Sequence, residues 1–272
     1  MIDTMLVDYH CHTAFSKDCD YPMEEQIRAA ITAGVREIAF TEHEDYNAED
    51  FTSYFFDHPA YWQAIHAFRR VYGNRLTIRA GIEISEPHRH LDTVEQVLQA
   101  YPWDFVLGSL HWVDGKHNTF LPSFFTAFGN WRESFRRYFV ELKLLAADGD
   151  YDILSHIDYP ARYGQAAFGN SYNIGEWETE IREVLRHVIA RGKGIEINTN
   201  PLRKGRNEPN PPASVIHWYY EMGGRYLTIG SDSHAPHQVG AQLGKAIAIA
   251  REAGFTQLAT YERRQPTLID IY

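Results

Sequence analysis

Short apolar runs that alternate with amphipathic segments constrain this chain more than any other feature of its sequence. Seven runs rich in β-branched residues are predicted to be buried strands, at residues 6–9, 37–41, 76–84, 105–110, 153–155, 194–197 and 226–229. Segments with helical periodicity lie between them, most clearly at 22–33, 131–147 and 178–191. This alternation predicts a parallel sheet with helices outside, and at 272 residues the sheet is expected to close into an α/β barrel.

The domain organisation is expected to be simple. No low-complexity run and no Pro- or Ser-rich linker marks a boundary, so residues 1–272 are predicted to form a single domain. Two segments, 51–61 and 116–129, are long for connections between a strand and a helix. They are expected to fold over the mouth of the barrel.

Charge and composition exclude several classes of partner. A formal net charge of -10 argues against a surface for nucleic acid or for an anionic membrane. No segment has the pattern of a secretory leader or the length of a membrane span. With only Cys11 and Cys19, a disulfide scaffold is excluded, and a reducing, cytoplasmic location is expected.

Histidines and acids gather where the predicted strands end, which is where parallel barrels carry their functional groups. His10 and His12 end the first strand and point the same way, because alternate residues of a strand share a face, whereas Cys11 faces away. Asp232 and His234 repeat this spacing after the seventh strand. The other candidates at strand ends are Glu42, His43, Glu83, His111, His156 and Asp158. The sixth strand ends in Asn198-Thr199-Asn200, without an acid or an imidazole.

A lone histidine is more often structural or solvated than a metal ligand, roughly nine times in ten. His187 and His217, in predicted helices, are interpreted in that way, and His117 and His237 are outside candidates. Repeated pairs at strand ends favour a metal site instead. Mixed imidazole and carboxylate ligands suit Zn, Mn, Fe or Co, and two to three divalent ions are expected because one ion cannot use them all. Glu83, from a middle strand, is the candidate for a bridging ligand.

Motifs along nearly the whole chain resemble the polymerase and histidinol phosphatase (PHP) superfamily. They are DYHCHT, TEHED, GIEIS, SLHWVDG, SHIDYPARYG, EINTNPLRKG and GSDSHAP. Within the superfamily the chain is most similar to the histidinol-phosphate phosphatases. The resemblance implies a distorted seven-stranded parallel barrel with a trinuclear metal centre.

The resemblance also implies roles for individual residues. The first ion would be bound by His10, His12, Glu83 and Asp232, the second by Glu83, His111 and His156, and the third by Asp18, His43 and His234. Some relatives have a histidine where this chain has Asp18, so the third site is expected to be the weakest. Arg162 and Arg203 match positions that contact the substrate phosphate, with surface arginines as the alternative, and Lys204 is expected to be solvated.

The reaction that the resemblance implies is the hydrolysis of a phosphomonoester, L-histidinol phosphate, in histidine biosynthesis. A hydroxide that bridges two cations would attack phosphorus, with Glu83, Asp232, Arg162 and Arg203 taking part in catalysis. Carboxylates at the mouth would attract the ammonium and imidazole of this small-molecule substrate. The candidates for these and other substrate contacts are Glu42, Glu44, Asp45, Asp158 and Asn198. The four acids could equally be partners that orient the metal-bound histidines.

Three other functions stay open. The chain could act on a nucleotide, a sugar phosphate or phosphotyrosine. It could be a hydrolase of the amidohydrolase type, although that class expects a ligating Lys or Glu after the fourth strand. A non-catalytic metal-binding module would lack some of the ligands, and none of the matched positions is empty.

Overall fold

Seven parallel strands form the central sheet of the computed structural model, which describes residues 5–169 and 171–271. Their order in the sheet is β1-β2-β3-β4-β7-β8-β9. The bounds are β1 (Leu6–Cys11), β2 (Val35–Glu44), β3 (Thr77–Ser85), β4 (Phe105–Ser109), β7 (Ile153–Leu154), β8 (Gly194–Asn198) and β9 (Leu227–Gly230). Each of the seven predicted strands overlaps one of them, so this part of the prediction is confirmed.

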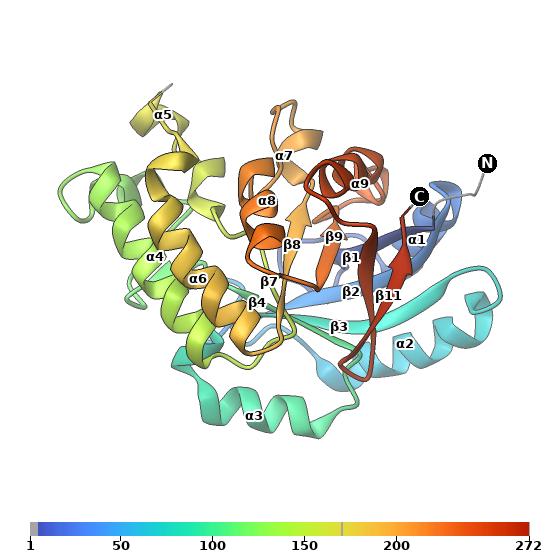
Figure 1. The fold of residues 1–272 in the computed structure, drawn as a ribbon. Coiled ribbons are helices and arrows are strands. Elements are labelled where there is room, and N and C mark those ends of the chain that lie inside the picture. Colours follow the sequence, from blue (N-terminus) through green and yellow to red (C-terminus); the bar gives the residue numbers. More distant parts are fainter. Residues whose placement is uncertain (1–4, 170, 272) are drawn as a thin grey trace.

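The sheet curls until its first and last strands meet (Figure 1). Cys11 and Ser233 form a parallel bridge, and the backbone N–H of His12 donates to the carbonyl of Ser233 at 2.9 Å. The N–H of Asp232 donates to the carbonyl of His10 at 2.8 Å. The predicted seven-stranded parallel barrel is therefore confirmed, with a seam between β1 and β9 held by fewer backbone bonds than the regular ladders.

Helices surround the barrel, as Figure 1 shows. Their bounds are α1 (Met23–Thr32), α2 (His58–Tyr72), α3 (Leu91–Ala100), α4 (Trp131–Asp148), α5 (Gln165–Phe168), α6 (Glu178–Ala190), α7 (Asn200–Arg203), α8 (Ala213–Glu221) and α9 (Leu243–Glu252). The predicted helices correspond to α1, α4 and α6. In α6 the predicted apolar face of Ile181, Val184, Leu185 and Val188 is buried. None of the helices in the described ranges has both the length and the apolar character needed to cross a bilayer.

An antiparallel hairpin of β10 (Gln257–Glu262) and β11 (Gln265–Asp270) follows α9 and was not predicted. The N–H of Arg263 donates to Oδ1 of Asp104, which precedes β4, at 3.1 Å. The guanidinium of Arg264 contacts Asp152, which precedes β7, at 3.0 Å. The turn of the hairpin thus lies at the amino ends of the barrel strands, and the opposite end is left for the candidate site.

The two long connections contain more regular structure than predicted. Helix α2 begins at His58, inside the predicted loop 51–61, and segment 116–129 contains β6 (His117–Asn118) and the 3-10 helix η2 (Pro122–Thr126). Strand β6 pairs with β5 (Trp112–Val113). The indole N–H of Trp112, in β5, donates to Asp50 at 2.6 Å, so the residue just before segment 51–61 contacts the strand that pairs with β6.

Candidate metal centre

Glu83 lies at the centre of a cluster of imidazoles and carboxylates at the carboxyl ends of the strands. Its Oε2 lies 3.2 Å from Nε2 of His10 and 3.5 Å from Nε2 of His12. Oδ1 of Asp232 lies 3.8 Å from the same atom of His12. One group of potential ligands therefore joins residues from β1, from β3 and from the segment that follows β9.

The other oxygen of Glu83 faces a second group. Oε1 lies 3.1 Å from Nε2 of His156 and 3.8 Å from Nε2 of His111. These three residues have ligand atoms within 4.8 Å of one another. Each oxygen of this one carboxylate thus points to a different set of imidazoles, which is the geometry that a bridging ligand requires.

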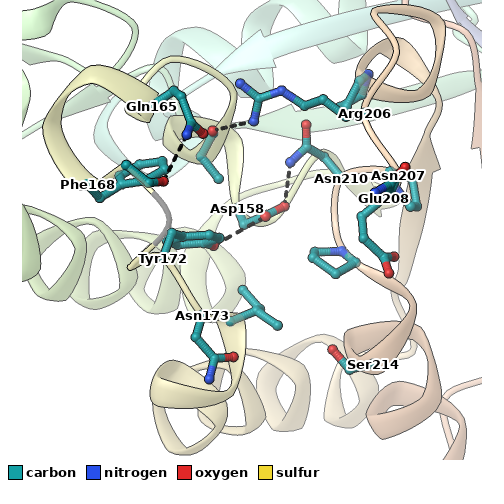
Figure 2. A pocket seen from close by; sticks show the side chains of 16 residues that line it. Asp158, Gln165, Phe168, Tyr172, Asn173, Arg206, Asn207, Glu208, Asn210 and Ser214 are labelled. Carbon is teal, nitrogen blue, oxygen red and sulfur yellow. Dashed lines mark hydrogen bonds between the residues drawn. The ribbon is translucent and has the colours of Figure 1, made fainter.

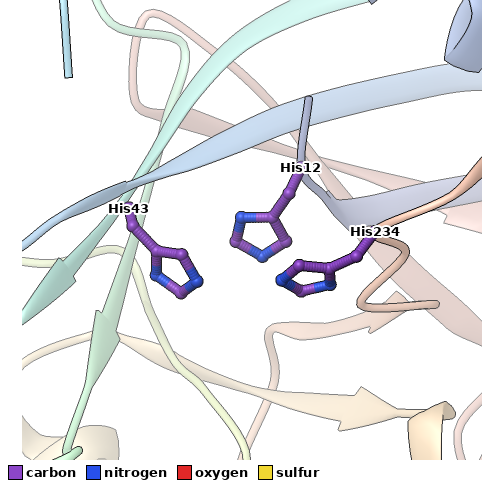
Figure 3. A group of neighbouring side chains, drawn as sticks. All are labelled: His12, His43 and His234. Carbon is purple, nitrogen blue, oxygen red and sulfur yellow. The ribbon is translucent and has the colours of Figure 1, made fainter. Parts of the chain in front are cut away.

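A third group lies nearer the surface. Oδ2 of Asp18 is 3.1 Å from Nε2 of His234 and 3.4 Å from Nε2 of His43. The ring of His12 stacks between those of His43 and His234, with centroid separations of 4.3 and 4.2 Å (Figure 3). All nine residues proposed from the sequence as ligands are therefore brought together.

The arrangement fits divalent cations better than it fits a set of hydrogen bonds. Nε2 of His12 and Nδ1 of His43 are buried and have no hydrogen-bond partner among the described residues. Burial, together with the neighbouring His234 and His43, lowers the pKa of His12 well below its ordinary value. Burial also lowers the pKa of His156 to about 4. The lowered pKa values favour the neutral form of His12 and His156 at pH 7, and a neutral ring offers a metal its lone pair.

Glu83 is charged despite complete burial. Burial alone would raise the pKa of its carboxyl, but the nearby charges of His10 and His43 hold that pKa well below the ordinary value. A buried carboxylate among imidazoles is a strong ligand for Zn, Mn, Fe or Co.

In His12 and His111, the ring nitrogen that faces away from the centre of the cluster contacts a serine hydroxyl. Nδ1 of His12 lies 3.1 Å from Oγ of Ser16, and Nδ1 of His111 lies 2.8 Å from Oγ of Ser85. Ser16 in turn donates to Glu42 at 2.7 Å. Such contacts fix the ring orientation and turn the Nε2 atoms toward the centre.

Arg162 and Arg203 both line the cavity above the cluster. Nη1 of Arg162 donates to Oδ2 of Asp232 at 2.6 Å, and its Nε donates to Asn210. Its Nη2 is buried without a hydrogen-bond partner in the described part of the chain. Arg203 donates from Nη1 to the carbonyl of Ser231 at 2.6 Å. Both guanidinium groups are therefore anchored by protein contacts beside the cluster.

The expected substrate contacts Glu42 and Asn198 lie elsewhere. Glu42 is fully buried and accepts hydrogen bonds from Thr13 and Ser16, and Asn198 is fully buried beside Asp232. Neither lines the cavity. The expectation fails for Glu42 because neighbours on a strand face opposite ways, and it is His43 that faces the cavity.

The other mouth carboxylates also lie outside the cavity. Glu44 contacts His58 at 2.7 Å, and Asp45 accepts a hydrogen bond from Thr52 at 2.6 Å. Asp158 faces a second cavity, where Asn210 and Tyr172 donate to it (Figure 2). Burial raises its pKa to about 6.

The rim of the inner cavity has a different composition from the one expected. It includes Tyr159, which begins the 3-10 helix η3 (Tyr159–Arg162), and Tyr163, which follows that helix. Asn200, Lys204 and Gln238 also belong to it. Segments 51–61 and 116–129 contribute no residue to it. Lys204 is exposed, as expected, but it also lines the cavity. His117 and His237 do not join the cluster, since His117 packs against Phe128 and His237 lies near α1.

Glu196 is the residue that the sequence analysis missed. It lies in β8 with Oε1 2.6 Å from Nδ1 of His10. A signal was present, because Gly-Ile-Glu-Ile occurs twice, at 81–84 around Glu83 and at 194–197 around Glu196. A single acid in the middle of a buried apolar strand needs a partner, and both acids find it in the same histidine.

A parallel barrel that gathers imidazoles and carboxylates at the carboxyl ends of its strands defines the class of metal-dependent barrel hydrolases. Residues 8–200 match the PHP domain family. The chain belongs to this family.

Named relatives span nearly the whole chain. Histidinol-phosphatase of Lactococcus lactis is 29% identical over 94% of this chain and 94% of its own length. A probable histidinol-phosphatase of Clostridium acetobutylicum is 32% identical over 90% of this chain and 93% of its own. The crystal structure of the Lactococcus lactis histidinol phosphate phosphatase, complexed with zinc, L-histidinol and phosphate, matches with a TM-score of 0.89. It is 26% identical in sequence, and the match covers 97% of this chain and all of the other.

Proposed function

We propose that this protein is a metal-dependent phosphatase that hydrolyses L-histidinol phosphate to L-histidinol and phosphate, a step of histidine biosynthesis. Relatives that align over nearly the whole chain bear the name histidinol-phosphatase, and one of them binds zinc, L-histidinol and phosphate in its crystal structure. The observation that carries the proposal for this chain is a pair of anchored arginines beside the three groups of metal-ligand side chains described above.

The proposed centre holds two to three divalent cations of Zn, Mn, Fe or Co. The ligand sets are His10, His12, Glu83 and Asp232 for the first, Glu83, His111 and His156 for the second, and Asp18, His43 and His234 for the third. When bound, the cations supply Lewis acidity for the phosphate oxygens and a nucleophile at neutral pH. Glu83 and Asp232 hold these charges in place.

Arg162 and Arg203 are the proposed phosphate contacts. Nη2 of Arg162 has no partner among the described residues, and because it is buried, a substrate oxygen that accepts from it would relieve an unsatisfied donor. The other nitrogens of Arg162 are already fixed by Asp232 and Asn210, so the guanidinium needs little reorganisation on binding. Arg203 is fixed by main-chain carbonyls in the same way.

Asn198 and Glu42 take a different role in this proposal. Since both are buried away from the cavity, they support the site from behind and do not contact the substrate. The aromatic rim offers the organic part of the substrate a surface instead. The ring of Tyr159 lies 4.4 Å from that of His156 and 5.4 Å from that of Tyr163, so an imidazole could stack at the same wall.

The remaining parts of the proposal concern the chain as a whole. Residues 1–272 would form one phosphatase domain with a small-molecule substrate and no nucleic-acid partner, consistent with the net charge of -10. A cytoplasmic location is supported by two buried cysteines that are both free thiols.

Phosphate release from a panel of esters tests the proposal. The purified protein is reconstituted with Zn²⁺ or Mn²⁺ and assayed with L-histidinol phosphate, a nucleoside monophosphate, a sugar phosphate, phosphotyrosine and p-nitrophenyl phosphate. We expect kcat/KM for L-histidinol phosphate to exceed that for every other ester by at least about tenfold. A higher kcat/KM for another ester would mean that L-histidinol phosphate is not the preferred substrate. If the metal-loaded protein hydrolyses none of the esters, the proposed function is overturned.

A further inference from the structure

Strand β8 carries none of the proposed metal ligands, yet it lies between two neighbours that lead to ligands. Strand β7 leads to His156, and β9 leads to Asp232 and His234. Glu196 and Asn198 are two apart on β8 and project to the same side, toward the cluster. Their exposed fractions are 1% and 0%.

The two oxygens of Glu196 contact two different candidate ligands. Oε1 lies 2.6 Å from Nδ1 of His10, and Oε2 accepts a hydrogen bond from the backbone N–H of His156 at 3.1 Å. His10 belongs to the first proposed ligand set and His156 to the second. One carboxylate thus contacts both sets without belonging to either.

Asn198 extends the contact to a third ligand. Its Nδ2 lies 3.2 Å from Oδ2 of Asp232, and 3.4 and 3.3 Å from the two oxygens of Glu196. The close approach depends on Gly230 of β9. A Cβ atom there would lie 2.3 Å from Cβ of His10 and 2.7 Å from Oε1 of Glu196. The backbone is therefore built to let this carboxylate reach the imidazole.

His10 lies between two carboxylates that have different positions. Glu83 approaches Nε2 from the cavity side, whereas Glu196 approaches Nδ1 from behind. Glu83 lines the cavity and Glu196 does not. Among the described residues, Glu83 belongs to groups whose atoms could hold an ion, and Glu196 belongs to none of them. Glu83 is therefore placed to bind an ion, whereas Glu196 is placed to orient His10, which is itself a proposed ligand.

We infer that Glu196 is a positioning residue of the metal centre, which directs Nε2 of His10 toward Glu83 and the proposed first ion, and holds the main chain of His156. This inference rests on the proposed metal centre. A carboxylate that accepts the Nδ1 proton fixes the tautomer and the ring orientation and makes Nε2 a stronger donor to a cation. Asn198 supports Glu196 and joins it to Asp232.

Glu196→Gln is the variant that tests the inference. The amide keeps the size of the side chain but has one acceptor oxygen, so it can accept from His10 or from the N–H of His156, and not from both. Glu141→Gln is the matched control. Glu141 is a buried glutamate that contacts a histidine outside the cluster, with Oε1 2.8 Å from Nε2 of His88.

Zn²⁺ affinity, measured by competition with a chromophoric chelator, is the primary measurement. The melting temperature of the metal-free protein is the second. We expect Glu196→Gln to weaken Zn²⁺ binding by roughly 10- to 100-fold, the size typical for partners of metal-bound histidines. Glu141→Gln should lower the melting temperature of the metal-free protein without weakening Zn²⁺ binding.

Wild-type Zn²⁺ affinity in a folded Glu196→Gln variant would overturn the inference. If that variant does not fold, Glu196→Asp takes its place, since it keeps the charge but is too short to reach both partners. Weaker Zn²⁺ binding is again expected, and unchanged affinity again overturns the inference. Because neither measurement uses a phosphate ester, a failure of the proposed catalytic function would be seen separately.

Discussion

Nη1 of Arg162 donates a 2.6 Å hydrogen bond to Oδ2 of Asp232, so a proposed phosphate contact directly touches a proposed metal ligand. Burial would raise the pKa of the Asp232 carboxyl, but Arg162 and His10 hold it well below the ordinary value. Within the described residues, the guanidinium of Arg203 donates hydrogen bonds to the carbonyls of Ser231 and Asp232 and to no carboxylate. The two arginines are therefore not equivalent, and their variants should differ.

Arg203→Ala should lose phosphatase activity and keep its metal. Removing a partly desolvated cation from the proposed phosphate site should cost about 2 to 4 kcal/mol, which corresponds to on the order of 30- to 1000-fold in kcat/KM. Steady-state kinetics with elemental analysis of the same sample checks both parts. Arg203→Lys should recover only part of the loss, because an ammonium cannot grip two oxygens as a guanidinium does. Normal kcat/KM in Arg203→Ala would make this a surface arginine.

Arg162→Ala should lose activity and also bind metal less tightly. Without Arg162, the carboxyl of Asp232 loses the strongest of the charges that lower its pKa, and protons compete better with the cation. Zn²⁺ affinity, measured by titration, should differ more between pH 6 and pH 8 for Arg162→Ala than for Arg203→Ala. Equal metal affinities in the two variants at both pH values would contradict this reading of the contact.

Glu83→Gln should lower metal content and kcat together. The amide removes the negative charge that two sets of imidazoles share, and its NH₂ group faces one set without a lone pair to offer. The decrease in Zn²⁺ affinity should be at least the roughly 10- to 100-fold typical of partners behind a ligand. A variant with wild-type metal content and wild-type kcat would exclude the bridge.

Asp18→Ala should remove the third ion and leave the other two. The side chain of Asp18 is 31% exposed and that of His234 is 25% exposed, whereas those of His10 and Glu83 are 1% exposed. Water weakens the attraction between a cation and its ligands more at the exposed third group than at the buried groups around Glu83. Elemental analysis should find one ion fewer per chain than in the wild type. Loss of all ions would show that the groups do not bind independently.

Zn²⁺ affinity should fall as the pH is lowered. Burial lowers the pKa of His43 but Asp18 and Glu83 raise it well above the ordinary value, and Glu196 and Glu83 act in the same way on His10. In the metal-free protein these two rings hold protons at neutral pH, so a cation must displace them. Calorimetry in buffers of different ionisation enthalpy should detect proton release on binding. Affinity that does not change with pH would contradict this.

The sequence predicted the barrel and the cluster because both depend on local periodicity. His10 and His12, two apart at the end of a strand, point the same way in any extended chain, and most of the other ligands follow from strand ends meeting at one rim. Asp18, in the segment after β1, was indicated only by the family resemblance. The same alternation argument, applied to Glu42 and His43, would have placed Glu42 on the face away from the cavity.

Other features depend on contacts between distant segments, which periodicity does not encode. The tie between Asp158 and Asn210 turns that carboxylate toward a second cavity, and nothing in SHIDYPARYG indicates it. The hairpin β10–β11 was missed for a similar reason, since its strands depend on Asp104 and Asp152 at the far end of the barrel. Glu196 needed the position of β1 beside β9 before its partner could be seen.

The seam between β1 and β9 has a consequence for how the protein opens. Few backbone bonds close it. His10 and His12 on one side and Asp232 on the other belong to the same proposed ligand set, the first. A cation bound there would connect the residues at the end of β1 to the residues that follow β9. Chelation should therefore loosen the barrel along this line first, and amide exchange in β1 and β9 should quicken before that in β2 and β3, where the ladder is continuous.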